Sequence, residues 1–227
     1  MLKKVADALG ADLLPEMTFV GGCTTGLLLT DIYTQEQVRH TDDVDLIVHV
    51  VGTLGFHQLT EQLKDRGFKL TIPDDDEAMP ICAMVLDELR VDFMPDDAQV
   101  LGFTNHWYQE ARKTATPYRL DDQTEIQLVT PVYFLATKIE AYKGRGKDDP
   151  LESRDMEDLM NLVDGRPELT QEVFRAPQEL RTYLATELNE LMQLRDFGYV
   201  VSSQAGGDSD REEWLYQQLE KIIHGKP

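Results

Sequence analysis

The sequence predicts an α/β half followed by an α-helical half, with the change near residue 130. Before that point, short apolar runs rich in β-branched residues alternate with segments of helical spacing, which is typical of an α/β fold. From Pro131 onward, the periodic segments have helical spacing. We find no internal repeat along the chain, so a repeat architecture is not indicated.

The first half is expected to alternate strands with helices. Pro15 ends the first helix, Gly67 stops a later one, and residues 87–89 separate the two runs of a β-hairpin. The expected helices cover residues 5–14, 23–32, 56–66 and 104–113. The expected strands cover residues 17–20, 44–51, 68–72, 81–86, 90–94, 116–120 and 125–129. Residues 33–40 are polar and are expected to form a loop.

The second half is expected to be helical. Pro131 and Pro177 each stand at the start of a periodic segment, and proline is well tolerated at the first position of a helix. The expected helices cover residues 131–142, 154–163, 177–195 and 211–224. Residues 202–210 are rich in Gly, Ser and Asp, so they are expected to form a mobile loop.

Composition limits the classes of function. The chain has 227 residues, 41% hydrophobic and 28% charged, which predicts a folded globular protein with room for a core. A net charge of −20 opposes non-specific attraction to nucleic acid or to anionic membranes. No apolar run is long enough to cross a bilayer, so no membrane partner is expected. With only Cys23 and Cys82, a disulfide framework is not indicated, and a cytoplasmic protein is expected.

Three aspartates at strand positions carry the most chemical information. Asp43 and Asp45 are two apart in a strand that continues as Leu46–Val48, so they project from the same face. Adjacent carboxylates repel each other, and a divalent cation relieves that repulsion. Asp92 lies in a later predicted strand. The pattern therefore predicts a Mg²⁺ site, with a solvated strand end as the alternative for Asp43 and Asp45.

Two other groups suit phosphate. Gly21 and Gly22 follow an apolar strand and precede a predicted helix, where backbone N–H groups can bind phosphate and glycine lets it approach closely. An ordinary tight turn is the alternative. A compact basic cluster lies in the second half, and its sign also matches a phosphate site. Its members are Lys138, Lys143, Arg145 and Lys147.

The order of these motifs resembles the nucleotidyltransferase superfamily with the polymerase-β-like fold. The shared order is an apolar strand into Gly21–Gly22, then Asp43-Val44-Asp45, then Asp92 on a neighbouring strand. Arg39-His40-Thr41 is similar to the Arg-x-Thr that precedes the acidic motif in bacterial members. The resemblance implies a mixed-sheet nucleotidyltransferase core over residues 1–130. It also implies that residues 131–227 form a helical region that completes the nucleotide cleft.

The second half resembles the AbiEii-like toxins, which are the nucleotidyltransferases of type IV toxin–antitoxin systems. In those proteins a helical lysine is followed by an arginine and then by Arg-Asp-x-x-Asp-Leu, as in Lys138, Arg145 and residues 154–159 here. The resemblance covers roughly residues 17 to 165 by motif order. It implies an antitoxin protein as a partner.

The resemblance assigns roles residue by residue. Asp43, Asp45 and Asp92 would be catalytic and would hold Mg²⁺, or Mn²⁺ in its place. The nucleoside triphosphate would be bound by a second group, and a third group would support the site. The predicted nucleotide-binding residues are Gly21, Gly22, Cys23, Thr24, Thr25, Lys138 and Arg145. The predicted supporting residues are Arg39, Thr41, Lys147, Asp155 and Asp158.

Cys23 departs from the family pattern, because many members have Ser or Thr after the second glycine. Thr24 or Thr25 would then have to supply the missing hydroxyl. Lys138 has the alternative of a helix lysine with its ammonium in solvent. Asp155 and Asp158 share a helical face, and Asp155 would pair with Lys138 or Arg145 or approach the metal. The alternative is a negative first turn, which the helix dipole favours.

The sequence predicts transfer of a nucleoside monophosphate to an acceptor hydroxyl on RNA, protein or a small molecule. Two other functions stay open. One is modification of a small, antibiotic-type acceptor, which the charge of −20 favours if that acceptor is cationic. The other is a nucleotidyltransferase-fold interaction module without activity. The base preference and the acceptor do not follow from these motifs.

Overall fold

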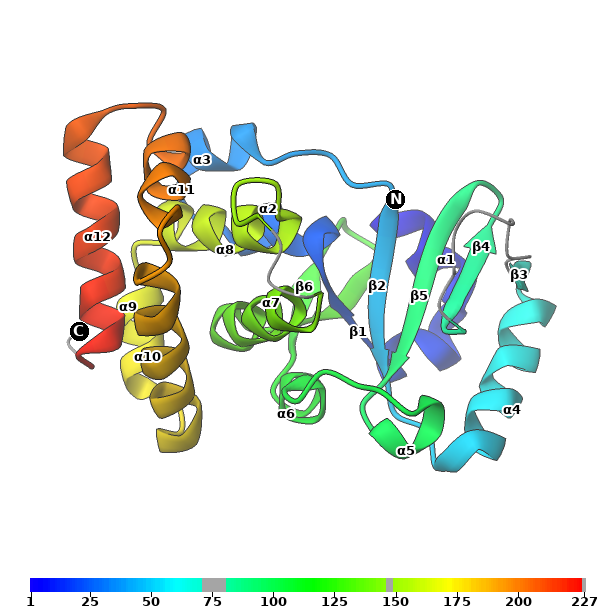
Figure 1. The fold of residues 1–227 in the computed structure, drawn as a ribbon. Helices are drawn as coiled ribbons and strands as arrows, with labels where there is room; N and C mark the ends of the chain where they lie inside the picture. Colours follow the sequence, from blue (N-terminus) through cyan, green and yellow to red (C-terminus); the bar gives the residue numbers. More distant parts are fainter. Residues whose placement is uncertain (71–80, 146–148, 226–227) are drawn as a thin grey trace. The chain divides into compact units, whose positions relative to one another are not determined.

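The computed structural model describes residues 1–70, 81–145 and 149–225, and the chain divides into two units (Figure 1). The first, here named the sheet unit, comprises Met1–Thr24 and His40–Thr130. The second, the helical unit, comprises Thr25–Arg39 and Pro131–Pro227. The α/β prediction, with a mixed sheet followed by a helical region, is confirmed.

The sheet unit contains a seven-stranded mixed sheet in the order β3-β4-β5-β2-β1-β7-β6 within the described residues. The β1–β7 and β2–β5 pairs are parallel, and the other neighbours are antiparallel. The strands are β1 Met17–Val20, β2 Asp43–Val48, β3 Phe68–Leu70, β4 Ala83–Leu86, β5 Leu89–Pro95, β6 Thr116–Arg119 and β7 Glu125–Leu128. The predicted strand over 17–20 and the predicted hairpin are confirmed as β1 and as β4 with β5.

The centre of the sheet is apolar because β-branched and aromatic residues fill β1, β2 and β5. Val44, Leu46 and Ile47 of β2 are fully buried, as are Phe19 of β1 and Val91 of β5. The sheet unit also contains helices and 3₁₀ turns, and α4 packs against β3 and α5. These are α1 Leu2–Leu13, η1 Leu14–Glu16, η2 Gly22–Thr24, α4 Gly52–Asp65, α5 Ala98–Leu101 and α6 Tyr108–Lys113.

The helical unit is built around α7, whose buried residues lie on all sides of the helix. Helices α8, α9 and α10 pack against it, and α12 packs on α8, α9, α10 and α11. The helices are α2 Thr25–Leu28, α3 Ile32–Gln37, α7 Pro131–Gly144, α8 Arg154–Gly165, α9 Leu169–Arg175, α10 Gln178–Met192, α11 Phe197–Gln204 and α12 Ser209–Ile223. None of the described helices combines the length and apolar character that a membrane span needs.

Residues 25–39 belong to the helical unit and contact the end of α8. The carbonyl oxygen of Gly165 accepts hydrogen bonds from the backbone N–H groups of Thr30 and Asp31, both at 2.9 Å. A Cβ at Gly165 would lie 2.9 Å from Leu29 Cδ1 and 3.0 Å from Thr34 Cγ2. This close approach therefore depends on the absence of a side chain at Gly165.

The prediction of one helix over residues 23–32 followed by a loop is wrong. The 3₁₀ turn η2 and the single-turn helix α2 occupy its first part, and α3 begins at Ile32. Asp31 caps α3, because its Oδ2 accepts the Thr34 backbone N–H at 2.8 Å. The same hydrogen bond lowers the pKa of the Asp31 carboxyl. An aspartate three residues before Thr34 was the signal for this helix start.

Four more helices were missed or misplaced. In the predicted helix over 104–113, only Tyr108–Lys113 is helical, and α5 precedes it. Helices α9 and α11 were not predicted, and α11 extends into the expected loop over 202–210. Phe197, Val200 and Val201 have helical spacing and are buried, so the apolar signal was present. Gly206 and Gly207 follow with positive φ angles of 62° and 78°, which ends the helix.

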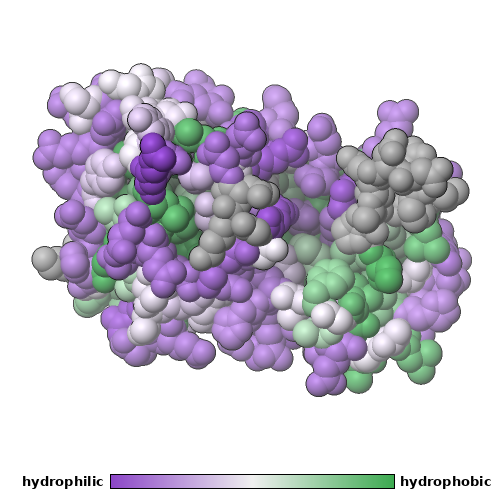
Figure 2. Space-filling model, viewed as in Figure 1, coloured by the Kyte–Doolittle hydropathy of each residue, from purple (hydrophilic) through white to green (hydrophobic). Residues whose placement is uncertain are grey.

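Hydrophilic residues predominate on the face shown in Figure 2, as the charge of −20 implies. Apolar residues gather on this face over α4 and α5 of the sheet unit. Val51, Leu54 and Phe103, at the start of α4 and just after α5, are among the exposed large apolar residues. They belong to neighbouring elements, because α4 packs against α5.

Candidate functional site

The register of β2 and β5 places the three predicted aspartates on one face of the sheet. Asp45 is paired with Asp92, and Asp43 is paired with Arg90 two residues earlier on β5. Residues directly opposite on neighbouring strands project to the same side, and so do residues two apart on one strand. Asp43, Asp45, Asp92 and Arg90 therefore form one charged group, named here the aspartate face.

Arg90 binds Asp92 with two hydrogen bonds. Its Nε donates to Oδ1 at 2.9 Å, and its Nη2 donates to Oδ2 at 2.7 Å. Two parallel, charge-assisted bonds of this kind are the strong form of an arginine–carboxylate contact. They are the main reason that the pKa of Arg90 is raised, and the charges of Asp92, Asp43 and Asp45 add to the effect.

The same charges act on Cys82, which precedes β4. Burial is the main cause that raises the pKa of the Cys82 thiol to about 11, and the charges of Asp92 and Asp45 raise it further. A thiol with this pKa is protonated at neutral pH and is a poor nucleophile. The chemistry of the aspartate face is therefore that of its carboxylates.

The Asp45 carboxylate lies directly against the backbone of Gly21. Gly21 has a φ angle of +79°, and a Cβ built on it would lie 1.8 Å from Asp45 Oδ2. Val20, the residue before it, is paired with Asp45 across β1 and β2. The glycine is thus required twice, once for the backbone conformation and once for the space that the carboxylate occupies.

We expect Gly21→Ala to displace the Asp45 carboxylate and to destabilise the protein by roughly 1–3 kcal/mol, because alanine is strained at positive φ. Thermal unfolding measures the loss of stability. Gly26→Ala is the matched control, because no atom lies within 4 Å of the Cβ that it would add. Equal melting temperatures for the two variants would show that Asp45 does not depend on Gly21.

In the predicted phosphate-binding loop after β1, the side chains of Cys23 and Thr24 contact the backbone of the loop itself. The Thr24 hydroxyl donates to the Gly21 carbonyl oxygen at 2.8 Å, and Thr24 is fully buried. The Cys23 thiol contacts the Val20 carbonyl oxygen at 3.3 Å. In the supporting segment before β2, the Thr41 hydroxyl contacts the Asp43 carbonyl oxygen at 3.4 Å. These contacts fix the loop and the start of β2 around the aspartate face.

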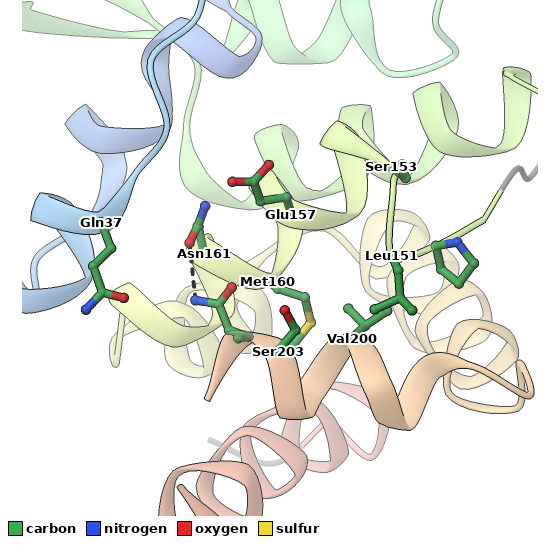
Figure 3. Close-up of a pocket in the computed structure, with 10 residues that line it drawn as sticks. Gln37, Leu151, Ser153, Glu157, Met160, Asn161, Val200 and Ser203 are labelled. Atoms are coloured by element: carbon green, nitrogen blue, oxygen red, sulfur yellow. Dashed lines mark hydrogen bonds between the residues drawn. The ribbon is translucent and has the colours of Figure 1, made fainter. Parts of the chain in front are cut away.

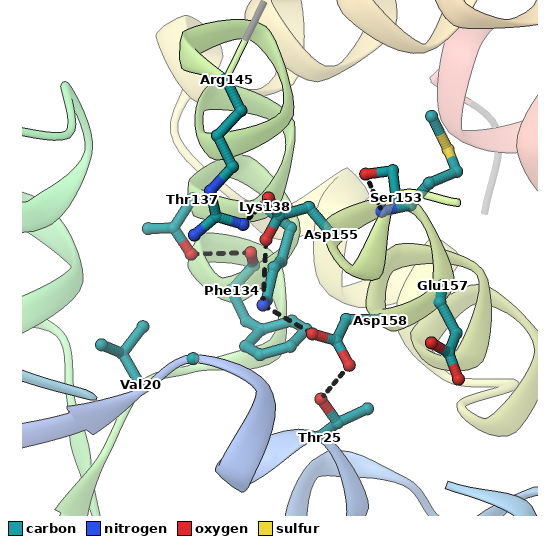
Figure 4. Close-up of polar contacts among 12 residues, drawn as sticks. Val20, Thr25, Phe134, Thr137, Lys138, Arg145, Ser153, Asp155, Glu157 and Asp158 are labelled. Carbon is teal, nitrogen blue, oxygen red and sulfur yellow. Dashed lines mark hydrogen bonds and ion pairs between the residues drawn. The ribbon is translucent and has the colours of Figure 1, made fainter. Parts of the chain in front are cut away.

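In the helical unit, Lys138 is buried between two carboxylates (Figure 4). Its Nζ lies 3.2 Å from Asp155 Oδ1 and 2.6 Å from Asp158 Oδ2. Both aspartates are almost fully buried, and they lie three apart on α8. The prediction of a shared helical face is confirmed, whereas the alternative of a lysine with its ammonium in solvent is wrong.

Three further predicted residues bind the same two carboxylates. The Thr25 hydroxyl donates to Asp158 Oδ1 at 3.0 Å, and Arg39 Nη2 lies 3.1 Å from Asp158 Oδ2. Arg145 forms an ion pair with Asp155. The expected pairing of Asp155 with Lys138 or Arg145 is found with both partners, whereas the gathering of all six residues around two buried carboxylates was not expected. The predicted supporting residue Lys147 lies outside the described residues.

The fit of a divalent cation depends on which carboxylates are accessible to it. Asp43 and Asp45 offer hard oxygen ligands on one strand, which suits Mg²⁺. Asp92 directs its two oxygens at Arg90. Within the described ranges, no group of three or more His, Cys, Asp or Glu side chains is placed to hold a metal ion. Asp92 is therefore held by Arg90, and Asp43 and Asp45 supply oxygen atoms of the kind that Mg²⁺ prefers.

A separate pocket of about 240 Å³ lies inside the helical unit (Figure 3). Polar side chains from α8 and α11, including Glu157, Asn161 and Ser203, line it. The Asn161 side chain is fixed there, because its Oδ1 accepts a hydrogen bond from Gln204 Nε2 at 3.2 Å. The pocket contains no predicted nucleotide-binding residue, so it is distinct from the aspartate face.

No protein family model and no curated protein matches this chain. Among solved structures, the chain is similar to an antigenic nucleotidyltransferase-like protein from Paracoccidioides brasiliensis. The two are 23% identical, and the match covers 86% of this chain and 88% of that chain with a TM-score of 0.47.

Proposed function

We propose that this protein is a divalent-cation-dependent nucleotidyltransferase that moves a nucleoside monophosphate from a nucleoside triphosphate to an acceptor hydroxyl. The observation that carries the proposal is the placement of Asp43, Asp45 and Asp92 on one face of two parallel strands. Repelling carboxylates at the centre of a sheet are costly unless positive charge compensates them; Arg90 supplies part of that charge, and a bound cation would supply the rest. Magnesium held by carboxylates commonly serves phosphate substrates.

The reaction assigns a task to each part of the site. The acceptor oxygen forms a bond to the α-phosphorus, the bond from that phosphorus to pyrophosphate breaks, and the acceptor proton is released. Asp43 and Asp45 would hold Mg²⁺ or Mn²⁺, which when bound would stabilise charge on the phosphate oxygens. Asp92 could take the acceptor proton once Arg90 releases it. The backbone N–H groups after Gly21 would hold the terminal phosphates.

The roles expected for Lys138 and Arg145 need a rearrangement. Both cations are paired with Asp155, and Lys138 is also paired with Asp158. They could neutralise triphosphate charge only if these ion pairs opened. Within the proposal, Lys138 therefore organises α7 and α8, and the more exposed Arg145 is the better candidate for a phosphate contact.

The sequence motifs also support a narrower proposal. The match of Lys138, Arg145 and Asp155 to the AbiEii-like motif supports a toxin with an antitoxin partner. The charge of −20 supports a cationic small-molecule acceptor as a second candidate. The Arg90–Asp92 contact supports an inactive interaction module as a third candidate, because it occupies one of the three carboxylates.

The test is label transfer. The purified protein is incubated with each α-labelled nucleoside triphosphate, Mg²⁺ or Mn²⁺, and one of three acceptors: total RNA, cell extract or an aminoglycoside. We expect labelled RNA, protein or small molecule, and the labelled product identifies the acceptor class. The absence of transfer, together with the absence of cation-dependent triphosphate binding by calorimetry, would refute the proposal.

A further inference from the structure

The pocket between α8 and α11 contains a buried hydrogen-bond donor that the fold does not use. Asn161 is 4% exposed, and its Nδ2 has no hydrogen-bond partner among the residues that the structure describes. A buried N–H group without an acceptor is costly, and most such groups in folded proteins have a partner. A molecule in the pocket that supplied an acceptor oxygen would remove this cost.

Contacts on the other side of the Asn161 amide fix which of its atoms is unpaired. Gln204 Nε2 donates to Asp164 Oδ2 at 2.9 Å, and an ionised carboxylate can only accept, so this atom of Gln204 is the nitrogen. The same nitrogen donates to Asn161 Oδ1 at 3.2 Å. A flipped Asn161 amide would place two donors against each other. Nδ2 is therefore turned away from Gln204, toward the side on which Glu157 lies in Figure 3.

The lining of the pocket defines the class of ligand. Its polar groups are amides, hydroxyls and one carboxylate, and no basic side chain is among the described lining residues. Arg39 Nε lies 3.1 Å from Glu157 Oε2 and compensates that carboxylate, so the lining favours an uncharged ligand. Amides and hydroxyls offer both donors and acceptors, and ligand hydroxyl groups match both. The polar lining residues are Gln37, Ser153, Glu157, Asn161, Ser203 and Gln204.

We propose that this pocket binds a small, uncharged polyhydroxy compound of the size of a monosaccharide or a cyclic polyol. One ligand hydroxyl accepts a hydrogen bond from Asn161 Nδ2, and another donates to Glu157. Leu151, Met160 and Val200 supply apolar contacts for the C–H groups of the ring. The volume of about 240 Å³ is below the roughly 300–1,000 Å³ of sites for drug-sized ligands, so the pocket suits a single ring rather than a nucleotide.

Access to the donor requires a local movement, because Asn161 Nδ2 is closed to solvent. Glu157 is suited to this movement, since its side chain is 42% exposed and lies one helical turn before Asn161 on α8. Its rotation exchanges part of the contact with Arg39 for a contact with a ligand hydroxyl. None of the lining residues belongs to the aspartate face, so the site is independent of nucleotidyl transfer.

The test follows the Asn161 side-chain amide by ¹H–¹⁵N nuclear magnetic resonance of the full chain during titration with myo-inositol or glucose. We expect a saturable shift of its signals with a dissociation constant on the order of 1 mM, because a few hydrogen bonds hold the ligand. Cyclohexanol, a ring with a single hydroxyl, should cause no saturable shift. The signals are assigned by their loss in Asn161→Leu.

Asn161→Leu removes the donor at similar volume, and Gln204 keeps Asp164 as an acceptor. Its affinity for myo-inositol, followed through the backbone amide of Ser203, should fall on the order of tenfold. The matched control is Asn189→Leu, the same change at an exposed residue of α10, which should bind like the wild type.

Ser203→Ala is a second variant, and it keeps the test decisive if Asn161→Leu does not fold. It removes one lining hydroxyl at an exposed position, so the affinity should fall about threefold while the fold is retained. Ser202→Ala is its control, because Ser202 is the preceding residue on α11 and does not line the pocket.

Three results would overturn the proposal. One is the absence of a saturable shift with both myo-inositol and glucose. Another is an affinity that neither Asn161→Leu nor Ser203→Ala lowers below that of its control. The third is binding of protonated glucosamine without binding of glucose, which would assign the pocket to a cation held by Glu157 instead of an uncharged ligand.

Discussion

Replacement of Lys138 by methionine is expected to destabilise the protein by about 3–5 kcal/mol, the usual cost of removing one partner from a buried ion pair. The Lys138 side chain is 9% exposed, and those of Asp155 and Asp158 are 2% and 0% exposed. Methionine has a similar length but no charge, so two buried carboxylates would lose the cation between them. Arg39 and Arg145 remain, but they compensate the two carboxylates only in part, so the cost arises from lost charge compensation rather than from lost packing.

Urea denaturation measures the free energy of unfolding of this variant. Arg145→Gln is the matched control, because Arg145 also pairs with Asp155 but its side chain is 69% exposed. An exposed ion pair contributes roughly 0–1 kcal/mol, so this control should unfold close to the wild type. Similar stabilities for Lys138→Met and Arg145→Gln would contradict a stabilising role for the buried cluster.

The cluster also shows what a sequence pattern can and cannot establish. The spacing of Asp155 and Asp158 predicts a shared helical face, and the structure confirms it. Their partners come from α7 and from residues 25–39, which are distant in sequence. No local periodicity encodes such contacts, so the common location of the six residues did not follow from their spacing in the sequence.

The aspartate face was more accessible to prediction because strand geometry is local. The two-residue spacing of Asp43 and Asp45 fixes their common direction. The same rule applied to Arg90-Val91-Asp92 would have placed Arg90 beside Asp92, and this signal was missed. The pairing of Asp45 with Asp92 needs the register of β2 and β5, which only the folded sheet provides.

The local sequence pattern does not predict that residues 25–39 pack apart from the strands on either side of them. This segment lies between β1 and β2 in sequence but packs with the helical unit. Gly165 makes that packing feasible, because a side chain there would collide with Leu29 and Thr34. A single glycine at the end of a helix does not indicate which distant segment packs against it.

Asp45→Asn is expected to reduce nucleotidyl transfer by about 10²- to 10⁴-fold, the effect of losing several kcal/mol of charge stabilisation in the transition state. Asparagine keeps the shape of aspartate, so the close packing over Gly21 is retained. Only the negative charge is removed. The variant loses both the repulsion from the neighbouring carboxylates and the attraction to Arg90, and because these effects oppose each other the melting temperature should change little.

Initial rates with a labelled nucleoside triphosphate, at saturating Mg²⁺, measure the effect. Asp42→Asn is the matched control: it is the same chemical change at an exposed residue just before β2. The control should retain wild-type activity within a factor of a few. A folded Asp45→Asn variant that transfers nucleotide as fast as Asp42→Asn would show that the aspartate face is not the catalytic site. A loss of activity at unchanged stability would instead separate the chemistry of Asp45 from its place in the fold.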